Sequence, residues 1–427
     1  MEIRRDRYLN RLIDRMHNGM VKVITGIRRC GKTYLLFNLF GDYLRSEGVD
    51  DDHIIEVALD VEESVALRDP AALSAYLRSR IANGREQYYV FLDEAQYAIS
   101  REELKNPDAP PRLYGVLNGL LRMRNVDVYV TGSNSKLLSH DVMTEFRGRG
   151  DEVRVRPLSF SEFMQGFDGD RWAEYTVYGG MPLTLSMHTD EQKARYLERL
   201  FEETYLKDVV ERYEIRKRDE LDDLVNVLAS GIGTLTNPSK LENTFKSVLH
   251  SKISSNTISS YIGYLEDAFV IEEARRYDVK GRGYIGSPLK YYFEDVGLRN
   301  ARLGFRQVEE SHIMENVVYN ELRARGYSVD VGVVEKRVRE EGRDVRRQLE
   351  VDFVANRGSD RVYIQSALEM RTPEKAAQEK ASLLGINDNF KKVVLVRDVV
   401  KPLRDEWGVV TMSVFDFLLD ENSLAGI

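Results

Sequence analysis

The sequence of 427 residues lacks several features that would place it in a special class of protein. It has one cysteine, Cys30, so no disulfide can form within the chain, which fits a reducing compartment. No apolar run approaches the roughly 18–20 residues of a membrane-spanning helix. The N-terminal segment MEIRRDRYLNRLIDRM has neither the uninterrupted apolar core nor the cleavage site of a signal peptide. These absences predict a soluble, cytoplasmic protein without a membrane partner.

Positive charge is also not in excess. The formal net charge is -8, from 70 acidic and 62 basic residues. General attraction for nucleic acid is therefore weak, and contact with DNA or RNA would need a local basic patch. A hydrophobic fraction of 42% and a charged fraction of 31% are typical of a folded globular protein. At this length we expect two to four domains.

Residues 1–157 alternate strand and helix patterns, as a parallel sheet with crossover helices does. Strands are predicted at 21–25, 54–59, 88–92 and 126–131, and helices at 2–18, 32–44, 70–83 and 112–124. Pro157 interrupts this pattern. The fold class predicted here is α/β, with a parallel sheet covered by helices.

Beyond residue 157 the pattern changes three times. Residues 158–235 are predicted as a helical lid or linker, and residues 236–305 as two helices followed by a hairpin, which is typical of a winged helix. A mixed α/β pattern returns at 306–427, with strands expected at 349–355, 362–366 and 392–396. The charged stretch 335–347 mixes both signs and is predicted to be a solvated loop.

Residues 26–33, GIRRCGKT, match the phosphate-binding pattern G-x-x-x-x-G-K-[ST] between an apolar strand and a helix. Backbone N–H groups and the positive end of the helix dipole can surround phosphates there. Lys32 is expected to reach the β- and γ-phosphates of ATP, and Thr33 to ligate Mg²⁺. Cys30 is interpreted as packed or tolerated, with a redox switch as the alternative. The predicted ATP-binding residues are Gly26, Ile27, Arg28, Arg29, Cys30, Gly31, Lys32, Thr33 and Tyr34.

The predicted strand 88–92 ends in two acids, Asp93 and Glu94. Asp93 is expected to hold the magnesium ion, usually through water. Glu94 is expected to orient and polarise the attacking water as a general base. The alternative is that the two acids only solvate a loop. Together with the P-loop, they predict ATP hydrolysis that depends on Mg²⁺.

Two further segments offer polar groups for the same site. The strand 126–131 runs into Gly-Ser-Asn-Ser, where Asn134 is assigned to the γ-phosphate or the attacking water. Arg147 and Arg149, in the sequence FRGRG, are candidates for the cation that neutralises transition-state charge. Ser and Asn are also ordinary turn residues, and an Arg-Gly loop is compatible with a solvated turn, so both alternatives stay open.

The predicted hairpin of residues 236–305 carries Lys280 and Arg282 in its loop. A helix-turn-helix with a basic wing can dock on DNA. The outward face of the second helix is rich in Ser and Thr, with little positive charge. The segment is therefore equally compatible with a module that only packs against the rest of the protein.

The motifs GIRRCGKT, FLDEAQ, TGSNSKLLS, FRGRG, RPLSFSEF and YGGMP are followed by LKYYFEDVGLRNA, HIMENVVYNEL and LEVDFVA. On these residues the chain resembles bacterial and archaeal AAA-superfamily ATPases that carry a C-terminal domain of unknown function. The resemblance covers essentially the whole chain. It implies an AAA-type ATPase core, a winged-helix segment and a C-terminal domain similar to the PD-(D/E)xK nuclease fold. It also implies that Arg149 is the better match for the arginine finger, and that subunits can assemble into a ring.

A working nuclease site of that kind holds Mg²⁺ with one acid from a helix and two from strands, and a nearby Lys activates the water. Glu315 and Asp352 match the first two positions, but Gln365 stands where the last acid is expected and Ala367 where the Lys is expected. These replacements remove a metal ligand and the ammonium group. We therefore predict that this site is inactive.

The sequence as a whole predicts an AAA-type ATPase that binds Mg-ATP, hydrolyses it slowly and couples this to a conformational change of its C-terminal half. A DNA-binding regulator whose conformation is set by ATP is the first alternative. A nucleotide-gated nuclease is the second, and the missing Lys argues against it. A DNA or protein client would bind through the winged-helix or C-terminal region.

Overall fold

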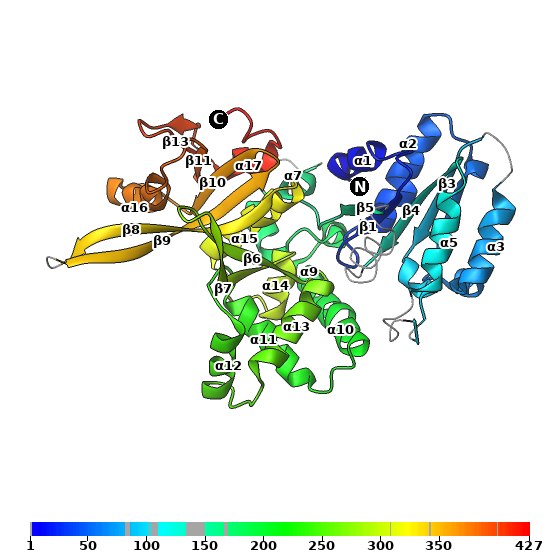
Figure 1. The fold of residues 1–427 in the computed structure, drawn as a ribbon, viewed down its shortest axis with the longest axis horizontal. Coiled ribbons are helices and arrows are strands. Elements are labelled where there is room, and N and C mark those ends of the chain that lie inside the picture. The colour runs from blue at the N-terminus through cyan, green and yellow to red at the C-terminus, as the bar shows by residue number, and fades with distance from the viewer. Residues whose placement is uncertain are drawn as a thin grey trace. The chain divides into compact units, whose positions relative to one another are not determined.

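The computed structural model describes residues 2–81, 86–100, 102–103, 110–133, 150–165, 170–307, 309–340, 343–398 and 400–427, with only the backbone described at 337–340 and 343–345 (Figure 1). The chain divides into two compact units. The first unit is Met1–Pro157 together with Asp267–Phe269, and the second is Leu158–Glu266 with Val270–Ile427.

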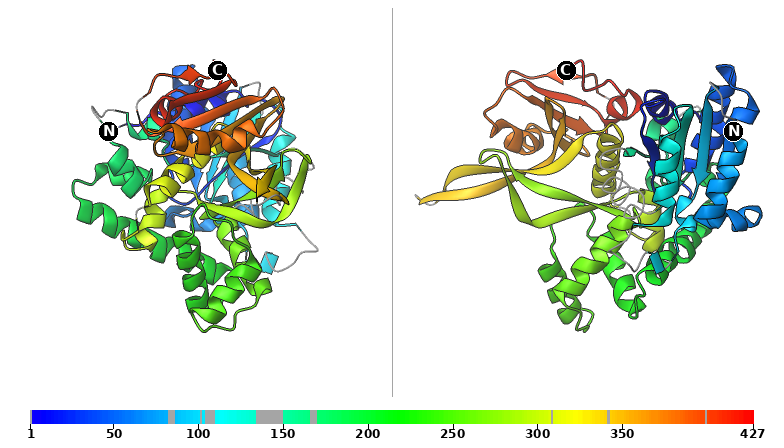
Figure 2. Two further views of the ribbon diagram at one scale, coloured as in Figure 1. Left: turned by 90° about the vertical axis from the view of Figure 1, so that its left-hand side faces the viewer. Right: turned by 45° about the vertical axis from the view of Figure 1, so that its right-hand side comes forward.

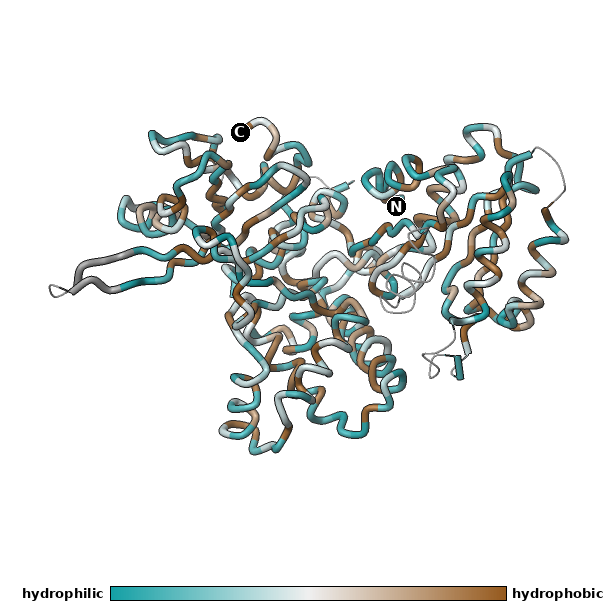
Figure 3. Tube along the Cα trace, viewed as in Figure 1, coloured by the Kyte–Doolittle hydropathy of each residue, from teal (hydrophilic) through white to brown (hydrophobic). Residues whose placement is uncertain are grey.

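The first unit contains a five-stranded sheet in the order β2-β3-β4-β1-β5, and all its neighbouring strands are parallel. Strands β1, β3 and β4 are buried along their whole length, as parallel strands covered on both faces are. Figure 3 shows the same strands mostly in the colour of hydrophobic residues. The predicted parallel α/β sheet is confirmed. The strands are β1 Val21–Thr25, β2 Ile54–Ala58, β3 Tyr88–Asp93, β4 Val126–Gly132 and β5 Gly150–Arg154.

One hydrophobic core of this unit packs α3 and α5 against strands β1 to β4. Helix α3 begins where the Asp69 side chain accepts the N–H of Ala72 and Pro70 takes the first helical position. The helix predicted at 2–18 is shorter, because the chain leaves it after Ile13 and His17 adopts a φ of 58°. The described helices are α1 Asp6–Ile13, a π-helical segment Tyr34–Phe40 continued by α2 Gly41–Ser46, α3 Pro70–Arg80, α5 Arg112–Leu121, and 3₁₀ turns Asp51–His53, Glu62–Arg68 and Ala95–Ala98.

The second unit begins with a largely helical part, in which polar side chains mark several helix starts. Thr189 and Gln192 form a capping box at α9, and Asn237 caps α12. The buried residues of α13 include Ile258 and Leu265, on the face that its amphipathic pattern predicts. The helices are α7 Phe160–Phe163, α8 Trp172–Tyr178, a 3₁₀ turn Pro182–Ser186, α9 Asp190–Arg199, a π-helical segment Leu200–Leu206, α10 Lys207–Arg212, α11 Arg218–Ser230, α12 Pro238–Ser247, α13 Ser255–Asp267, α14 Val296–Arg302, α15 Glu310–Ala324, α16 Pro373–Leu384 and α17 Val414–Leu419. Within the described ranges of the chain, we find no helix whose length and apolar character would let it cross a bilayer.

An eight-stranded sheet in the order β12-β13-β11-β10-β9-β8-β6-β7 completes the second unit. Strands β8, β9 and β10 form an antiparallel meander, and α16 then leads to β11, which pairs parallel to β10. Helices α15 and α17 pack in one hydrophobic core of the sheet, and α16 packs in another. The strands are β6 Ile271–Asp278, β7 Gly283–Phe293, β8 Ser328–Glu340, β9 Arg343–Arg357, β10 Asp360–Ala367, β11 Lys391–Val396, β12 Leu403–Arg404 and β13 Val409–Ser413.

The hairpin predicted as a wing is formed by β6 and β7, and it belongs to this same sheet. Strand β6 pairs parallel to β8 where Arg276 meets Val331 and Asp278 meets Val333. The hairpin thereby joins the sheet through β8, whose other neighbour, β9, carries Asp352. The sequence, which treats the wing and the last segment as separate patterns, does not predict this pairing.

The solvated loop predicted at 335–347 is wrong. These residues continue β8 and β9 into a two-stranded ribbon, paired from Glu335 opposite Gln348 to Glu340 opposite Arg343. The ribbon projects beyond the rest of the sheet in Figure 1 and in the right-hand view of Figure 2. Backbone pairing that starts in the buried part of the two strands extends outward, and charged side chains on a projecting ribbon can remain in water. A mixed-charge composition therefore does not exclude strand structure here.

Candidate functional site

The P-loop connects β1 to the π-helical segment that begins at Tyr34. Gly26 and Gly31 have φ values of 143° and 100°, which favour glycine. A Cβ atom on Gly26 would lie 2.0 Å from the carbonyl oxygen of Val155, so a larger residue does not fit there. Arg29, which is not glycine, has a φ of 62°. The loop is thus held in a conformation that its glycines make possible and that strains Arg29.

Lys32 lies inside this loop and is 3% exposed. Its Nζ donates hydrogen bonds to the carbonyl oxygens of Gly26 at 3.0 Å and Ile27 at 3.2 Å. The carboxylate of Glu94 lies 4.0 Å from the same nitrogen. Because the two hydrogen-bond acceptors are uncharged carbonyl groups, most of the ammonium charge remains to attract an anion.

Asp93, the last residue of β3, is held by two hydroxyl groups. Thr33 Oγ1 donates to Asp93 Oδ2 at 2.8 Å, and Thr131 Oγ1 donates to Oδ1. Burial raises the pKa of Asp93 above its usual value, and the two hydroxyl bonds oppose that shift. Thr33 and Asp93, the predicted magnesium ligands, therefore lie together, and hydroxyl and carboxylate oxygens are a donor set that suits Mg²⁺.

Glu94 has φ and ψ of 50°, a left-handed conformation that few residues with side chains adopt. Its N–H donates to Thr131 Oγ1 at 3.0 Å. Its Oε2 accepts hydrogen bonds from the Gln96 amide and, at 3.3 Å, from Ser133 Oγ. Backbone strain of this kind gathers at functional sites. The Glu94 carboxylate is thereby held by two polar side chains directly after the carboxyl end of β3.

Thr131 and Ser133, small polar residues at the end of the predicted strand 126–131, join the site as expected, and Gln96 joins it beyond those chosen from the sequence. Ser133 also accepts a hydrogen bond from Arg28 Nε at 3.1 Å. Thr131 and Ser133 could be found from the sequence, because they lie where β4 ends beside β3. Gln96 lies in a 3₁₀ turn after the acidic pair, where no sequence pattern indicates a role.

The remaining predicted residues of this site are placed only in part. Asn134, Arg147 and Arg149 lie outside the described residues. Cys30 is buried, and its Sγ lies 3.4 Å from the carbonyl oxygen of Val155. This contact agrees with the interpretation of Cys30 as a packed residue. Tyr34, at the start of the helix, is 39% exposed.

A second group of ionisable residues lies in and against the eight-stranded sheet, with Lys290, Glu315 and Asp352 buried and Glu350 partly exposed. Lys290 on β7 places Nζ 2.9 Å from Glu315 Oε1 and 2.6 Å from Glu350 Oε1. The Tyr292 hydroxyl donates to the same Glu315 oxygen at 2.5 Å. We call Lys290, Glu315, Glu350 and Asp352 the acidic cluster. Sequence reasoning selects Glu315 and Asp352 but misses Lys290, because Lys290 belongs to the hairpin predicted as a wing.

Asp352 lies in β9 beside this lysine and its carboxylates. Its Oδ2 accepts the N–H of Ser366 at 2.8 Å, and its own N–H donates to Gln365 Oε1 at 3.4 Å. Burial and the negative charge of Glu315 raise the pKa of Asp352 well above its usual value, and Lys290 opposes this shift. The structure therefore brings together the Glu315, Asp352 and Gln365 positions of the predicted nuclease-like site.

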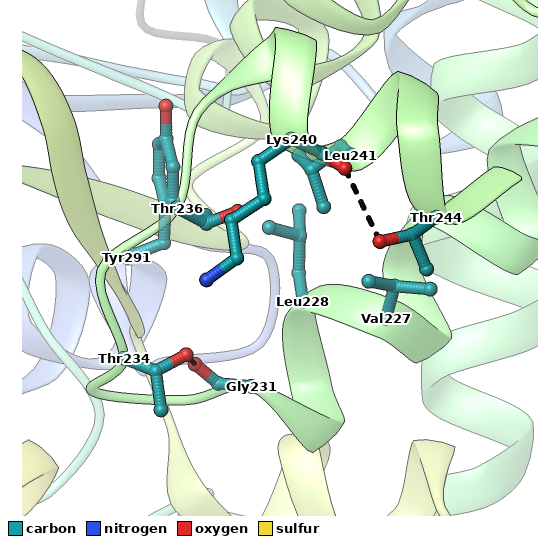
Figure 4. Close-up of a pocket in the computed structure, with 9 residues that line it drawn as sticks. All are labelled: Val227, Leu228, Gly231, Thr234, Thr236, Lys240, Leu241, Thr244 and Tyr291. Atoms are coloured by element: carbon teal, nitrogen blue, oxygen red, sulfur yellow. Dashed lines mark hydrogen bonds between the residues drawn. The ribbon is translucent and has the colours of Figure 1, made fainter.

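A cavity of about 120 Å³ lies between α11, α12 and β7 in the same unit (Figure 4). The Lys240 amine points into it and donates to the carbonyl oxygen of Leu235 at 3.0 Å. Small-molecule sites usually measure about 300–1,000 Å³, so this cavity is too small for a nucleotide. The lining residues are Val227, Leu228, Gly231, Thr234, Thr236, Lys240, Leu241, Thr244 and Tyr291.

Comparison with known proteins gives two family matches and two relatives of similar length. Residues 18–164 match the AAA domain family, and residues 169–309 match a domain of unknown function. An uncharacterized protein of Haemophilus influenzae is 31% identical over 425 residues, which cover 98% of each chain. An uncharacterized protein of Methanocaldococcus jannaschii is 28% identical over 387 residues, or 86% of this chain and 79% of that protein.

Two solved structures match this chain at low structural similarity. The Walker-type ATPase of Pyrococcus abyssi matches with a TM-score of 0.47 and 16% identity, over 71% of this chain and 96% of that chain. The Orc1 protein of Aeropyrum pernix in complex with DNA matches with a TM-score of 0.29 and 14% identity, over 71% and 92%. Both likenesses are too distant to support a function.

Proposed function

Because this chain belongs to one family with the Haemophilus influenzae protein and carries an AAA domain at residues 18–164, we propose that it binds Mg-ATP and hydrolyses it slowly. One observation carries the proposal. Lys32, the Thr33–Asp93 pair and the strained Glu94 follow the carboxyl ends of β1 and β3, which flank β4 in the parallel sheet. Open α/β sheets bind their ligands at this edge.

The proposed task of each residue follows from its atoms. Lys32 would exchange its two carbonyl partners for β- and γ-phosphate oxygens. Thr33 and Asp93 would hold Mg²⁺, which when bound neutralises phosphate charge. Glu94 would take a proton from the attacking water, with Gln96 holding its carboxylate until then.

The test is a measurement of ATP binding and turnover by the purified full chain, with Mg²⁺ and with EDTA. We expect binding that depends on Mg²⁺, followed by slow release of phosphate. Thr33→Ala should weaken the dependence on Mg²⁺, because it removes one of the proposed ligands. Binding that is the same with Mg²⁺ and with EDTA would contradict the proposal.

Assembly is a further part of this proposal, based on the sequence of residues 146–150, FRGRG. Arg149, with Arg147 as the alternative, would act as an arginine finger on the nucleotide of a neighbouring subunit. Specific ATPase activity should then rise with protein concentration, and ATP should favour association. Light scattering beside the activity assay tests this. Turnover that is independent of concentration, from a chain that stays monomeric with ATP, would rule out a finger in trans.

For the C-terminal part of the second unit we propose an inactive domain of the PD-(D/E)xK type whose conformation responds to ATP. Support comes from the order of elements, a helix α15, the meander β8–β10, the crossover α16 and the parallel strand β11. Gln365 and Ala367 occupy the positions of the last acid and the Lys. We expect no metal-dependent cleavage of single- or double-stranded DNA. Cleavage that disappears in Asp352→Ala would contradict this proposal.

ATP-controlled binding of nucleic acid is a second candidate function, favoured by the β8–β9 ribbon. In its register Lys336 stands opposite Arg347. Like charges directly opposite destabilise a strand pair, and the phosphates of a nucleic acid would relieve that repulsion. Lys280 in the β6–β7 turn adjoins the ribbon, with Nζ donating to the carbonyl oxygen of Glu335 at 2.8 Å.

A two-stranded ribbon fits the major groove of DNA, so the ribbon is the contact to test. Fluorescence anisotropy with duplex DNA should show affinity that falls steeply with salt. The double change Lys336→Glu and Arg347→Glu should abolish binding, and Lys240→Glu, away from the ribbon, should not. Equal loss in both variants would point to a general charge effect and contradict the ribbon as the contact.

A further inference from the structure

The lysine of the acidic cluster is buried and contacts two carboxylates. Lys290 is 3% exposed, and Nζ contacts carboxylates from two different elements, Glu315 on α15 and Glu350 on β9. Removing an ammonium group from water is costly unless it is paired. Attraction to the two carboxylates offsets the desolvation free energy of the ammonium group, and Lys290 in turn lowers the repulsion between the two carboxylates.

Lys290 Nζ contacts Glu315, one of the two acids predicted to hold a metal ion, and its positive charge also acts on the other, Asp352. Mg²⁺ needs oxygen ligands at about 2.0–2.1 Å in octahedral geometry. An ion placed between Glu315 and Glu350 would lie against the ammonium group and repel it. A metal can therefore enter only if Lys290 leaves, and a buried ammonium group without partners would be unfavourable.

Resting on the nuclease-like fold proposed above, we infer that the Nζ of Lys290 is the resident cation of the acidic cluster and takes the place of a divalent metal. The domain thereby keeps the acids of the fold while a metal-activated water has no place among them.

A catalytic use of Lys290 does not fit its surroundings. Burial by itself would lower the pKa of Lys290, but Glu315, Asp352 and Glu350 together raise it above its ordinary value. The amine therefore stays protonated and cannot take a proton from water. Gly233 lies against the Glu315 carboxylate, because a Cβ atom on Gly233 would come within 3.3 Å of the Glu315 oxygens.

The two tryptophans make the test specific for this unit. Trp172 and Trp407 are the only tryptophans of the sequence, and both lie in the second unit. Their fluorescence in urea therefore reports unfolding of that unit within the full chain. For the wild type we expect the same urea midpoint in Mn²⁺ and in EDTA. Lys290→Ala should have a lower urea midpoint than the wild type in EDTA, and Mn²⁺ should restore that midpoint. Binding of Mn²⁺ to this variant should be detected by electron paramagnetic resonance.

Lys280→Ala serves as the matched control, because it removes an exposed lysine of the same hairpin and should gain no response to Mn²⁺. Wild-type protein that binds Mn²⁺ and loses it in Asp352→Asn would overturn the inference. A folded Lys290→Ala variant without any gain in Mn²⁺ binding would also overturn it.

If Lys290→Ala does not fold, a charge-balanced pair keeps the inference testable. Lys290→Met combined with Glu315→Gln should have a higher urea midpoint than Lys290→Met alone, because the second change removes the uncompensated carboxylate. An equal or lower midpoint would contradict the role of Lys290 as compensating cation. ATP affinity should be unchanged in all these variants, so failure of this inference is distinct from failure of the proposed ATPase.

Discussion

The P-loop and the acidic cluster each bury a lysine next to carboxylates, and the two lysines are partnered in opposite ways. Lys32 donates to two backbone carbonyls and has its carboxylate neighbour, Glu94, 4.0 Å away. Lys290 contacts two carboxylates at 2.9 and 2.6 Å. Both side chains are equally hidden, at 3% exposure.

The difference shows that burial alone does not identify a working lysine. A carbonyl oxygen satisfies a hydrogen bond of an ammonium group but leaves its net charge, so Lys32 can still attract phosphate. Two carboxylates accept hydrogen bonds from the ammonium group of Lys290 and also neutralise its charge, so Lys290 has little affinity left for an anion. The acids next to the two lysines also differ in their partners. Asp93 accepts hydrogen bonds from two hydroxyl groups, which can also ligate a metal ion. Asp352 accepts a hydrogen bond from a backbone N–H group, which cannot.

The largest expected effect tests this contrast directly. Lys32→Ala should remove two charge-assisted bonds to phosphate, each about 1.5–3 kcal/mol, which corresponds to about 10²–10⁴-fold weaker Mg-ATP binding. Lys290→Ala should leave that affinity unchanged and lower the urea midpoint of the second unit. Calorimetric titration and tryptophan fluorescence measure the two effects. Unchanged nucleotide affinity in a folded Lys32→Ala variant would contradict the role of Lys32 in binding phosphate, and with it the contrast between Lys32 and Lys290.

Glu94→Gln should separate binding from turnover at the first site. The amide cannot accept the proton from water, so turnover should fall by about 10²–10⁴-fold while ATP affinity stays close to that of the wild type. Glu63→Gln, which changes an exposed acid of the same unit, is the control and should have no effect. If Glu94→Gln hydrolyses ATP at the parent rate, another residue positions the water.

Comparison of the wild type with Asp352→Asn should reveal how the ionisation of Asp352 makes the stability of the second unit depend on pH. The pKa of Asp352 is raised in the folded chain, so the folded state holds the proton more tightly than the unfolded state does. Its contribution to stability is complete below the unfolded value of about 3.9 and is lost as the pH rises through the folded value. The stability of the wild type relative to Asp352→Asn should therefore fall with rising pH.

Urea midpoints of both proteins across this pH range measure that difference. The groups that face Asp352 are Glu315 on α15, Lys290 on β7 and Glu350 on β9. In a Lys290→Met background the fall should extend to higher pH, because Lys290 lowers the pKa of Asp352. A difference that is independent of pH would show that Asp352 has the same pKa in both states.

The smallest expected effect concerns Gln96, whose amide holds the Glu94 carboxylate. A hydrogen bond to the charged form lowers basicity. Gln96→Ala should therefore raise turnover, by about 3–10-fold for the loss of one modest bond. Gln87→Ala, outside the site, should not change it. A fall in turnover would instead mean that Gln96 orients Glu94 for catalysis.

Much of the first unit could be predicted because its signals are local. Strand β1 matches its prediction at both ends, and β3 and β4 differ from theirs by one residue at the carboxyl end. Continuous apolar runs predict buried parallel strands, and the glycines of the P-loop motif permit the backbone conformation of that loop. The prediction at 335–347 failed because charge composition was given more weight than strand pairing, which depends on a partner far along the chain.

The sequence by itself determined which residues of the first unit gather at the P-loop, because the glycines, Lys32, Thr33 and the acids Asp93 and Glu94 stand next to the strands that position them. It also predicted an inactive nuclease-like site, because Gln365 and Ala367 stand where that resemblance expects an acid and a lysine. Only the tertiary structure decided what fills the second site. Lys290 reaches Glu315 and Glu350 through the pairing of β6 with β8 and the packing of α15, and such contacts between distant segments leave no periodic or spaced pattern in the chain.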